Sequence, residues 1–249
     1  MMNEYICLRD GMKIYCRSYV PDTGNKKYPT IIMCHGFNGS YSGNIKYADI
    51  FTSAGYACVM FDFCGGAIRS RSDGNMVDMT VTSEVKDLDS VMDFTLSLEF
   101  CDSENLFLMG KSQGGVVAAI EAAKREDEIR GLLLFYPAFV IPHDAREREK
   151  QFETIPESIE LMGGVIGKPY LEDALSLDIE GCIKAYDKNV LILQGDQDEI
   201  VPLQSSEKAA NLYKSATLHV INGAGHGFSK DTASYAGKIA SEFIRKNIK

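Results

Sequence analysis

The sequence predicts an α/β fold: a mostly parallel sheet, entered by an antiparallel hairpin and covered by helices on both faces. Short apolar runs recur along the chain and alternate with segments of helical periodicity. These runs show no polar alternation, which is typical of parallel strands buried on both faces. The expected core strands are Thr30–Cys34, Ala57–Phe61, Leu106–Met109, Gly131–Phe135, Val190–Leu193 and Thr217–Ile221.

Two strand-like segments precede the core strands. Tyr5–Arg9 and Lys13–Tyr19 flank an Asp10-Gly11 pair, which is a turn signal typical of a β-hairpin. The Ala-rich segment Gln113–Arg125 follows a core strand directly and is expected to be a helix. Apolar residues spaced by three and four predict two further helices, one through Val85, Leu88, Met92 and Leu96 and one through Ala236, Ile239, Ala240, Phe243 and Ile244.

One stretch breaks the alternation of strands and helices. Nearly fifty residues, from about 138 to 187, separate two core strands where a single helix would suffice. The stretch contains Pro142, a charge run at 146–150 and the pair Gly163-Gly164. We expect a single domain over residues 1–249 that carries an inserted helical or mixed cap at about 138–187.

Composition narrows the function classes. The 249 residues are 45% hydrophobic and carry a formal net charge of -9, which argues against nucleic-acid binding because that function needs a clustered positive surface. Seven cysteines without a CxxC pair are expected to be reduced, and four histidines make a metal site unexpected. No stretch is long enough to span a membrane and no signal peptide is evident, so we expect a cytoplasmic protein.

The segment Gly110-Lys111-Ser112-Gln113-Gly114 matches the pattern G-x-S-x-G, in which the serine is a nucleophile. The bare pattern occurs by chance. Here it lies between an expected strand and an expected helix, which is the context that the motif requires. The sharp turn strains the serine backbone, and the helix N-terminus behind it favours developing negative charge. Ser112 is therefore the candidate nucleophile.

A nucleophilic serine needs a base, and only four histidines are available. His219 lies inside an expected strand and is interpreted as structural, whereas His143 falls in the expected cap. His35 directly follows a core strand and is a candidate for a substrate contact. His226 lies in the glycine-rich loop 223–227 after the last strand, which makes it the candidate base.

The base in turn needs an orienting acid, expected after the preceding strand. Asp196, Asp198 and Glu199 all occur there, and spacing alone does not separate Asp196 from Asp198. The chain order of serine, then acid, then histidine is that of α/β-hydrolases.

These motifs together resemble the α/β-hydrolase superfamily. The elements that carry the resemblance are His35-Gly36-Phe37, Gly-x-Ser-x-Gly-Gly at 110–115, Gly-Asp-Gln-Asp-Glu-x-Val-Pro at 195–202 and Gly-x-x-His at 223–226. More narrowly, the chain is similar over essentially its whole length to small bacterial cinnamoyl (feruloyl) esterases, which also resemble monoacylglycerol lipases. The resemblance implies the α/β-hydrolase fold and a carboxylesterase that acts on hydroxycinnamate esters.

The resemblance also implies roles for individual residues. Asp198 would be the acid of the triad and Asp196 structural. The backbone N–H groups of Phe37 and Gln113 would form the oxyanion hole. A planar aromatic acid would lie beneath the cap, where Asp144 and Tyr170 are candidates for contact with its phenolic hydroxyl. The implied reaction calls for no metal or organic cofactor.

The chain departs from the family pattern at two places. Many relatives carry a Gly-His-Gly-x-Ser turn after the fourth strand, whereas this chain has a longer loop at 63–74 without the histidine. Arg69 and Arg71 of that loop would either face the pocket and prefer an anionic substrate or lie on the surface. Lys111 stands before Ser112 where relatives often have histidine, which raises the alternative of a Ser-Lys dyad.

Other functions share this chemistry and stay open. A monoacylglycerol lipase or short-acyl esterase would use the same triad beneath a more apolar cap, and a thioesterase or peptidase would use it on another acyl group. A binding protein built on an inactive hydrolase fold is the non-enzymatic alternative. The expected partner is a small-molecule ester, and a homodimer stays open because no interface motif is evident.

Overall fold

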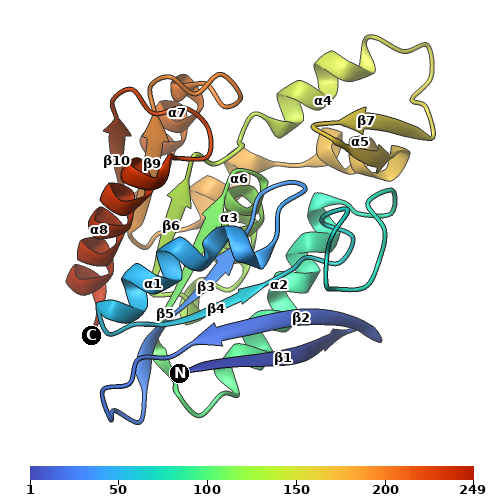
Figure 1. The fold of residues 1–249 in the computed structure, drawn as a ribbon. Helices are drawn as coiled ribbons and strands as arrows, with labels where there is room; N and C mark the ends of the chain where they lie inside the picture. The colour runs from blue at the N-terminus through green and yellow to red at the C-terminus, as the bar shows by residue number, and fades with distance from the viewer.

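The computed structural model describes residues 1–249 and contains an eight-stranded sheet in the order β1-β2-β4-β3-β5-β6-β9-β10 (Figure 1). The strands from β4 to β10 pair in parallel, and β1 and β2 join one edge in antiparallel fashion. The expected fold class is thereby confirmed. The strands of this sheet are β1 (Met2–Arg9), β2 (Met12–Tyr19), β3 (Tyr28–Cys34), β4 (Ala57–Phe61), β5 (Cys101–Lys111), β6 (Gly131–Phe135), β9 (Val190–Gly195) and β10 (Ala216–Ile221).

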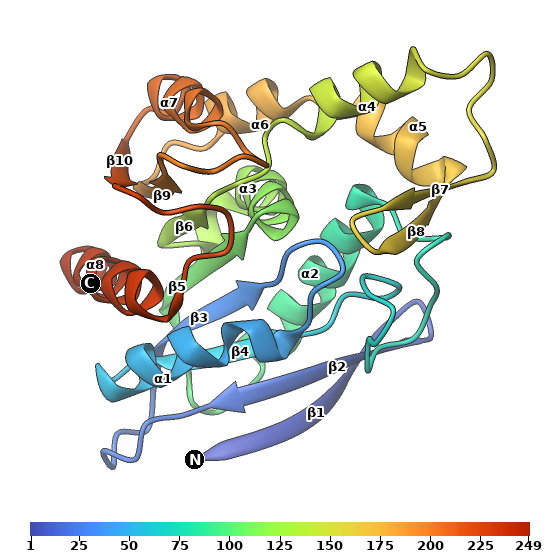
Figure 2. The ribbon, with the colours of Figure 1, turned by 45° about the horizontal axis from the view of Figure 1, so that its top comes forward.

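Helices cover both faces of the sheet. The α-helices are α1 (Ile45–Ser53), α2 (Val81–Leu96), α3 (Gln113–Lys124), α4 (Ile141–Glu149), α5 (Lys168–Ser176), α6 (Ile179–Ala185), α7 (Leu203–Leu212) and α8 (Lys230–Asn247). Two short 3-10 helices, η1 (Tyr41–Asn44) and η2 (Glu126–Glu128), lie in loops. Helices α1 and α8 pack on one face, and α2, α3, α6 and α7 pack on the other (Figure 2).

Two helical layers explain why the core strands lack polar alternation. In β3, Ile31 and Met33 belong to the core beneath α1 and α8, whereas Ile32 and Cys34 belong to the core beneath α2 and α3. All four side chains are fully buried. Because successive side chains point to opposite faces, a strand covered on both faces is apolar throughout.

The β1–β2 hairpin closes as the sequence predicts. Arg9 pairs with Met12, and the two residues between them, Asp10 and Gly11, have φ angles of 51° and 85°. Positive φ at both positions is the geometry of a tight type I′ turn, which an Asp-Gly pair adopts readily.

The stretch between β6 and β9 contains the expected mixture of elements. It holds α4, a separate antiparallel hairpin formed by β7 (Ser158–Leu161) and β8 (Gly164–Gly167), then α5 and α6. Helices α4 and α5 and the hairpin project beyond the carboxyl ends of the core strands (Figures 1 and 2). Helix α6 instead packs on the core beside α3 and α7. We call residues 138–177 the cap segment.

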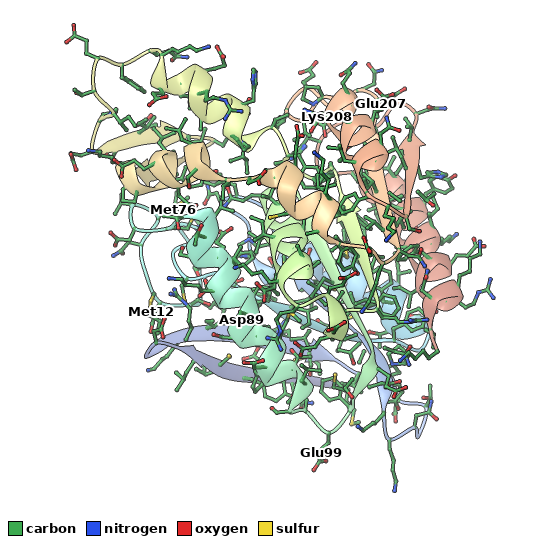
Figure 3. The ribbon with its side chains drawn as sticks, turned by 180° about the vertical axis from the view of Figure 1, so that it is seen from behind. Met12, Met76, Asp89, Glu99, Glu207 and Lys208 are labelled. Atoms are coloured by element: carbon green, nitrogen blue, oxygen red, sulfur yellow. The ribbon has the colours of Figure 1, made fainter.

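The cap segment approaches the backbone of the body at Gly167, where only glycine fits, and packs against a flexible side chain at Gly164. A Cβ on Gly167 would lie 2.0 Å from the carbonyl oxygen of Val77, and one on Gly164 would lie 2.6 Å from the Met76 side chain. In the view from behind, Met76 lies where the loop before α2 meets the cap segment (Figure 3). The hairpin therefore rests directly on the loop that precedes α2.

The structure also bears on the cysteines and on membrane-spanning segments. All seven cysteines are free thiols and six of them are buried. None of the helices combines the length and the apolar character needed to cross a bilayer.

The central strand gives a test of this core. Leu108 of β5 is fully buried, so Leu108→Ala is expected to lower the free energy of unfolding by about 2–5 kcal/mol because it leaves a cavity. Leu8 of β1 is 63% exposed, and Leu8→Ala is the matched control with an expected change within about 0.5 kcal/mol. Denaturant titration of both variants measures the difference, and equal losses would contradict the assigned core.

Candidate active site

Ser112 lies at the turn where β5 ends and α3 begins. Its φ of 52° and ψ of -123° fall outside the regions that L-residues favour. The surrounding structure holds this strain, and strained backbones of this kind concentrate at functional sites. The turn exposes the Ser112 side chain at the carboxyl edge of the sheet.

The glycines around Ser112 are required by close backbone contacts. A Cβ on Gly110 would lie 2.2 Å from the carbonyl oxygen of Gly114, and one on Gly114 would lie 2.2 Å from that of His35. A Cβ on Gly36 would lie 3.0 Å from the Ser112 Cβ. The spacing of glycines therefore lets β5, α3 and the loop after β3 meet at Ser112.

His226 bonds to Ser112 and to Asp198. Its Nε2 lies 3.0 Å from Ser112 Oγ, and its Nδ1 lies 2.8 Å from Asp198 Oδ2. His226 comes from the loop after β10 and Asp198 from the loop after β9, so three segments distant in sequence converge. The geometry fits a neutral imidazole that donates Nδ1–H to Asp198 and accepts the Ser112 hydroxyl proton at Nε2.

The Asp198 side chain is fully buried and well supplied with donors. Its Oδ1 accepts from the N–H groups of Ile200 and Val201 at 3.0 and 2.8 Å, and Gln194 donates to Oδ2 at 3.0 Å. Burial alone would raise the pKa of Asp198, but the hydrogen bonds from His226 and from Val201 outweigh it and hold the pKa below its usual value. The carboxylate therefore stays ionised beside the imidazole at neutral pH.

The structure separates Asp198 from the other acids and His226 from the other histidines. Asp196 is exposed and accepts a hydrogen bond from the Gly223 N–H at 2.7 Å, so it holds the loop after β10. His219 lies in β10 with its Nε2 3.3 Å from the Tyr235 hydroxyl, and His143 is exposed on α4. Neither histidine is among the partners of Ser112.

Two backbone N–H groups beside Ser112 have no acceptor in the protein. That of Gln113 is the first of α3, where a helix offers no intrahelical partner. That of Phe37, in the loop that packs on Ser112 through Gly36, donates to no protein group. Free donors at a helix N-terminus are suited to binding an oxyanion.

An apolar cavity of about 300 Å³ opens from Ser112 beneath the cap segment. Its lining combines Phe37 and Gln113 of the body with cap residues that include Val140, Asp144 and Tyr170. Asp144 lies at the cavity wall, where partial burial raises its pKa above the usual value against the lowering effect of His143 and Arg148. Tyr170 is buried.

A buried chain of side chains joins Tyr170 to the body. The Tyr170 hydroxyl donates to Gln113 Oε1 at 2.7 Å, and Gln113 Nε2 donates to Glu84 Oε2 at 2.8 Å. Glu84 of α2 is 1% exposed, and burial raises its pKa well above the usual value, against the lowering effect of Gln113. The cap segment is thus bonded to the residue that follows Ser112.

Comparison with known proteins identifies the family. A family model described as serine aminopeptidase, S33, matches residues 25–180, and one described as alpha/beta hydrolase fold matches residues 133–232. The chain belongs to the S33 family of α/β-hydrolases. The matched families place the chain among hydrolases of this fold.

Individual relatives extend the comparison. Est1E from Butyrivibrio proteoclasticus with bound ferulic acid superposes with a TM-score of 0.90, at 27% identity over 98% of both chains. A monoacylglycerol lipase from Paleococcus ferrophilus superposes with a TM-score of 0.75 over 95% of this chain and the whole of the lipase chain. At 19% identity this similarity shows the fold alone.

A curated relative, an uncharacterized 31.7 kDa protein from the traX-finO intergenic region of Escherichia coli, is 33% identical over 122 residues. Those residues are 49% of this chain and 40% of the relative, so the chain spans less than half of that relative's length.

The sequence did not predict the place of His35 in this α/β-hydrolase. Its Nδ1 bonds to the Gly36 carbonyl at 2.8 Å, and its Nε2 accepts from the Phe63 N–H at 3.1 Å. Burial lowers the pKa of His35 to about 4, so the ring is neutral at pH 7. Both nitrogens are occupied by backbone groups, and His35 holds the loop rather than offering a hydrogen bond to a substrate.

The structure shows where the arginines of the loop at 63–74 and the lysine before Ser112 lie. Arg71 bonds to Glu4 at 3.3 Å and stacks on the Tyr15 ring, and Arg69 is exposed, so neither arginine lines the hydrolase cavity. The ammonium of Lys111 donates to the Gly43 carbonyl at 2.8 Å rather than to Ser112. The arrangement of a Ser-Lys dyad is absent.

Sequence reasoning missed Glu84 and the side chain of Gln113. The signal for Glu84 was its position on the apolar face of α2, one residue before Val85 and four before Leu88. An acidic residue on a face that is buried must find a partner. No comparable signal marked Gln113, whose neighbours come from α2 and α5.

The close contact at Gly114 gives a test of the site's construction. Gly114→Ala is expected to push α3 away from the loop after β3 and so to move Ser112. The rate of ester hydrolysis is then expected to fall at least about 100-fold, because a small displacement of a catalytic group slows the reaction strongly. Gly225→Ala is the control, since its Cβ would meet nothing closer than 3.5 Å although it adjoins His226. Thermal unfolding and ester hydrolysis are measured on both, and full activity of Gly114→Ala would contradict the packing.

Proposed function

We propose that this α/β-hydrolase is a serine carboxylesterase that hydrolyses esters of hydroxycinnamic acids through an acyl-enzyme. The observation that carries the proposal is the cavity that starts at Ser112 and has hydrogen-bonding groups, Tyr170 and Asp144, in an otherwise mostly apolar lining. An apolar slot with few polar groups suits a planar aromatic acid with a hydroxyl group.

In the first step His226 takes the Ser112 proton at Nε2 while Oγ attacks the ester carbonyl carbon. Asp198 orients the ring and stabilises the imidazolium that forms. The N–H groups of Phe37 and Gln113 bind the oxyanion of the tetrahedral intermediate, each contributing roughly 3–4 kcal/mol by analogy with measured oxyanion holes. The acyl carbon–oxygen bond to the alcohol then breaks, and His226 returns the proton to the leaving alkoxide.

In the second step water replaces the alcohol. His226 removes a proton from the water, whose oxygen attacks the acyl-enzyme carbonyl. The same two N–H groups bind the second oxyanion, and the Ser112–acyl bond breaks as Ser112 recovers its proton. One ester and one water give one carboxylic acid and one alcohol. His226 carries every proton in both steps.

The Glu84–Gln113–Tyr170 chain supports the choice of acyl group. Because Gln113 Nε2 donates to Glu84, its Oε1 faces Tyr170 and accepts the phenolic proton. The Tyr170 oxygen is then left as an acceptor. Asp144 is an acceptor as well when ionised. A substrate hydroxyl can donate its one proton to either of these acceptors, whereas a methoxy group at the same place has no proton to donate.

The comparisons support the same substrate class. Ferulic acid is the ligand named for Est1E, which is similar over 98% of this chain at 27% identity. The family model is described by an aminopeptidase activity. An amide substrate therefore belongs in the test of this proposal.

A paired substrate panel tests the proposed activity. We expect high kcat/KM on methyl ferulate and methyl p-coumarate and low values on p-nitrophenyl butyrate, a monoacylglycerol and an aminoacyl p-nitroanilide. Ser112→Ala is expected to reduce ester hydrolysis by about 10⁴-fold or more, because the nucleophile is removed. Activity confined to the short-acyl or glycerol esters would reject the hydroxycinnamate assignment and keep the triad.

Tyr170→Phe tests how the acyl group is recognised. The variant removes the acceptor for the substrate hydroxyl, so kcat/KM on methyl p-coumarate is expected to fall about tenfold, the size of one hydrogen bond. Methyl cinnamate lacks that hydroxyl and serves as the matched control substrate. An equal fall on both esters would show that Tyr170 acts on the fold of the cap segment rather than on the substrate.

A further inference from the structure

A second cavity, of about 180 Å³, lies on the other side of Ser112. Its walls include Ser112, His226, Tyr136 and the glycine-rich loop that contains Gly39 and Gly43. His226 lines this cavity and is absent from the lining of the larger one beneath the cap segment. The two cavities therefore meet at the serine.

Proton transfer assigns a role to each cavity. In the proposed reaction His226 must protonate the alkoxide as it leaves, so the alcohol portion of the ester has to lie within reach of its Nε2. Only the smaller of the two cavities is lined by His226. The acyl portion then lies beneath the cap segment, and the alcohol portion lies in the smaller cavity.

Lys111 gives the smaller cavity a cation. The side chain lines it and is about nine-tenths buried, with 9% exposure. An ammonium has three donors, and that of Lys111 makes one hydrogen bond, to the Gly43 carbonyl at 2.8 Å. The Tyr47 ring lies 5.7 Å from Nζ.

No carboxylate compensates this charge. The charged group that acts on the Lys111 pKa is Lys46, another cation, and together with burial, the larger effect, it lowers the pKa to about 7. A buried ammonium without a counter-ion is unfavourable, and an anion supplied by a ligand would remove that penalty. The chain as a whole is acidic, at -9, so Lys111 and Lys46 are not part of a general positive surface.

We propose that Lys111 makes the smaller cavity a subsite for an alcohol that carries a carboxylate, so that the preferred substrates are esters of hydroxy acids. The inference rests on the proposed acyl transfer at Ser112 and adds the chemical class of the leaving group. Hydrolysis then releases a hydroxycinnamic acid and a hydroxy acid, with the proton from His226 on the oxygen of the hydroxy acid.

A merely structural role for Lys111 makes a different prediction. The bond to Gly43 ties η1 to β5, and η1 follows the loop that bears Phe37. If that were its only effect, loss of the ammonium would disturb the oxyanion donors. Every ester would then be affected alike, whatever alcohol it contained.

The test uses two esters of ferulic acid that differ by one group: O-feruloyl glycolate, which carries a carboxylate, and O-feruloyl glycolamide, its neutral isostere. Lys111→Met keeps an unbranched side chain close in length to the aliphatic part of lysine and removes the ammonium. The ratio of kcat/KM for glycolate over glycolamide is expected to fall about tenfold or more from wild type to Lys111→Met, the size of one charge-assisted hydrogen bond. Comparing ratios cancels the different intrinsic reactivities of the two esters.

Lys238→Met is the matched control. Lys238 is exposed on α8 and lines neither cavity, so its loss is expected to leave the ratio within about twofold of wild type because exposed charges are screened. A ratio unchanged in Lys111→Met, with both esters slowed equally, would overturn the subsite and leave Lys111 a structural tie.

A binding measurement separates this inference from the proposed activity. Both esters are titrated into Ser112→Ala protein, with and without Lys111→Met, so that no turnover is needed. Tighter binding of the glycolate ester that depends on Lys111 supports the subsite even if wild type hydrolyses neither ester, in which case the proposed activity fails alone. Equal binding of the two esters overturns the subsite.

Discussion

The site depends on one constraint, the backbone-to-backbone packing at the turn that carries Ser112. β5, α3 and the loop after β3 approach so closely that Gly110 and Gly114 have no space for a Cβ. Ser112 has a strained backbone at this contact, and the first N–H of α3 and that of Phe37 have no acceptor in the protein. The histidine and aspartate loops then need only reach one fixed atom, Ser112 Oγ.

Asp198 and His226 are held by ordinary hydrogen bonds around that fixed point. The carboxylate is buried, yet His226 and the N–H groups of Val201 and Ile200 hold its pKa below the usual value, so it stays ionised beside the imidazole. In the proposed reaction, specificity for the substrate comes from side chains that surround Ser112 Oγ. The Glu84–Gln113–Tyr170 chain links the cap segment to the turn, and Lys111 lines the cavity on the opposite side.

Much of this architecture is predictable from sequence because it depends on local rules. The core strands are continuous apolar runs since both faces of the sheet are covered, and β4 and β6 have the predicted bounds. The Asp10-Gly11 turn needs positive φ at two residues, which that pair supplies. The convergence of Ser112, Asp198 and His226 follows from their positions after parallel strands, whose carboxyl ends share one edge.

The remainder depends on contacts between distant elements. Glu84 and Gln113 are 29 positions apart, and their bond exists only because α2 packs beside α3. The strands β7 and β8 are four residues each, and a run of that length is too short to predict a strand from its pattern. His35 seemed free to meet a substrate because the sequence does not show that Phe63 N–H and the Gly36 carbonyl occupy its ring.

The most direct test of the central claim is to locate the covalent adduct formed with a fluorophosphonate probe by intact-protein and peptide mass spectrometry. We expect one adduct per chain, on Ser112, whose formation is slowed by several orders of magnitude in a folded His226→Gln variant because the base is lost. A wild-type protein that stays unlabelled, or an adduct on another residue, would show that Ser112 is not the activated nucleophile.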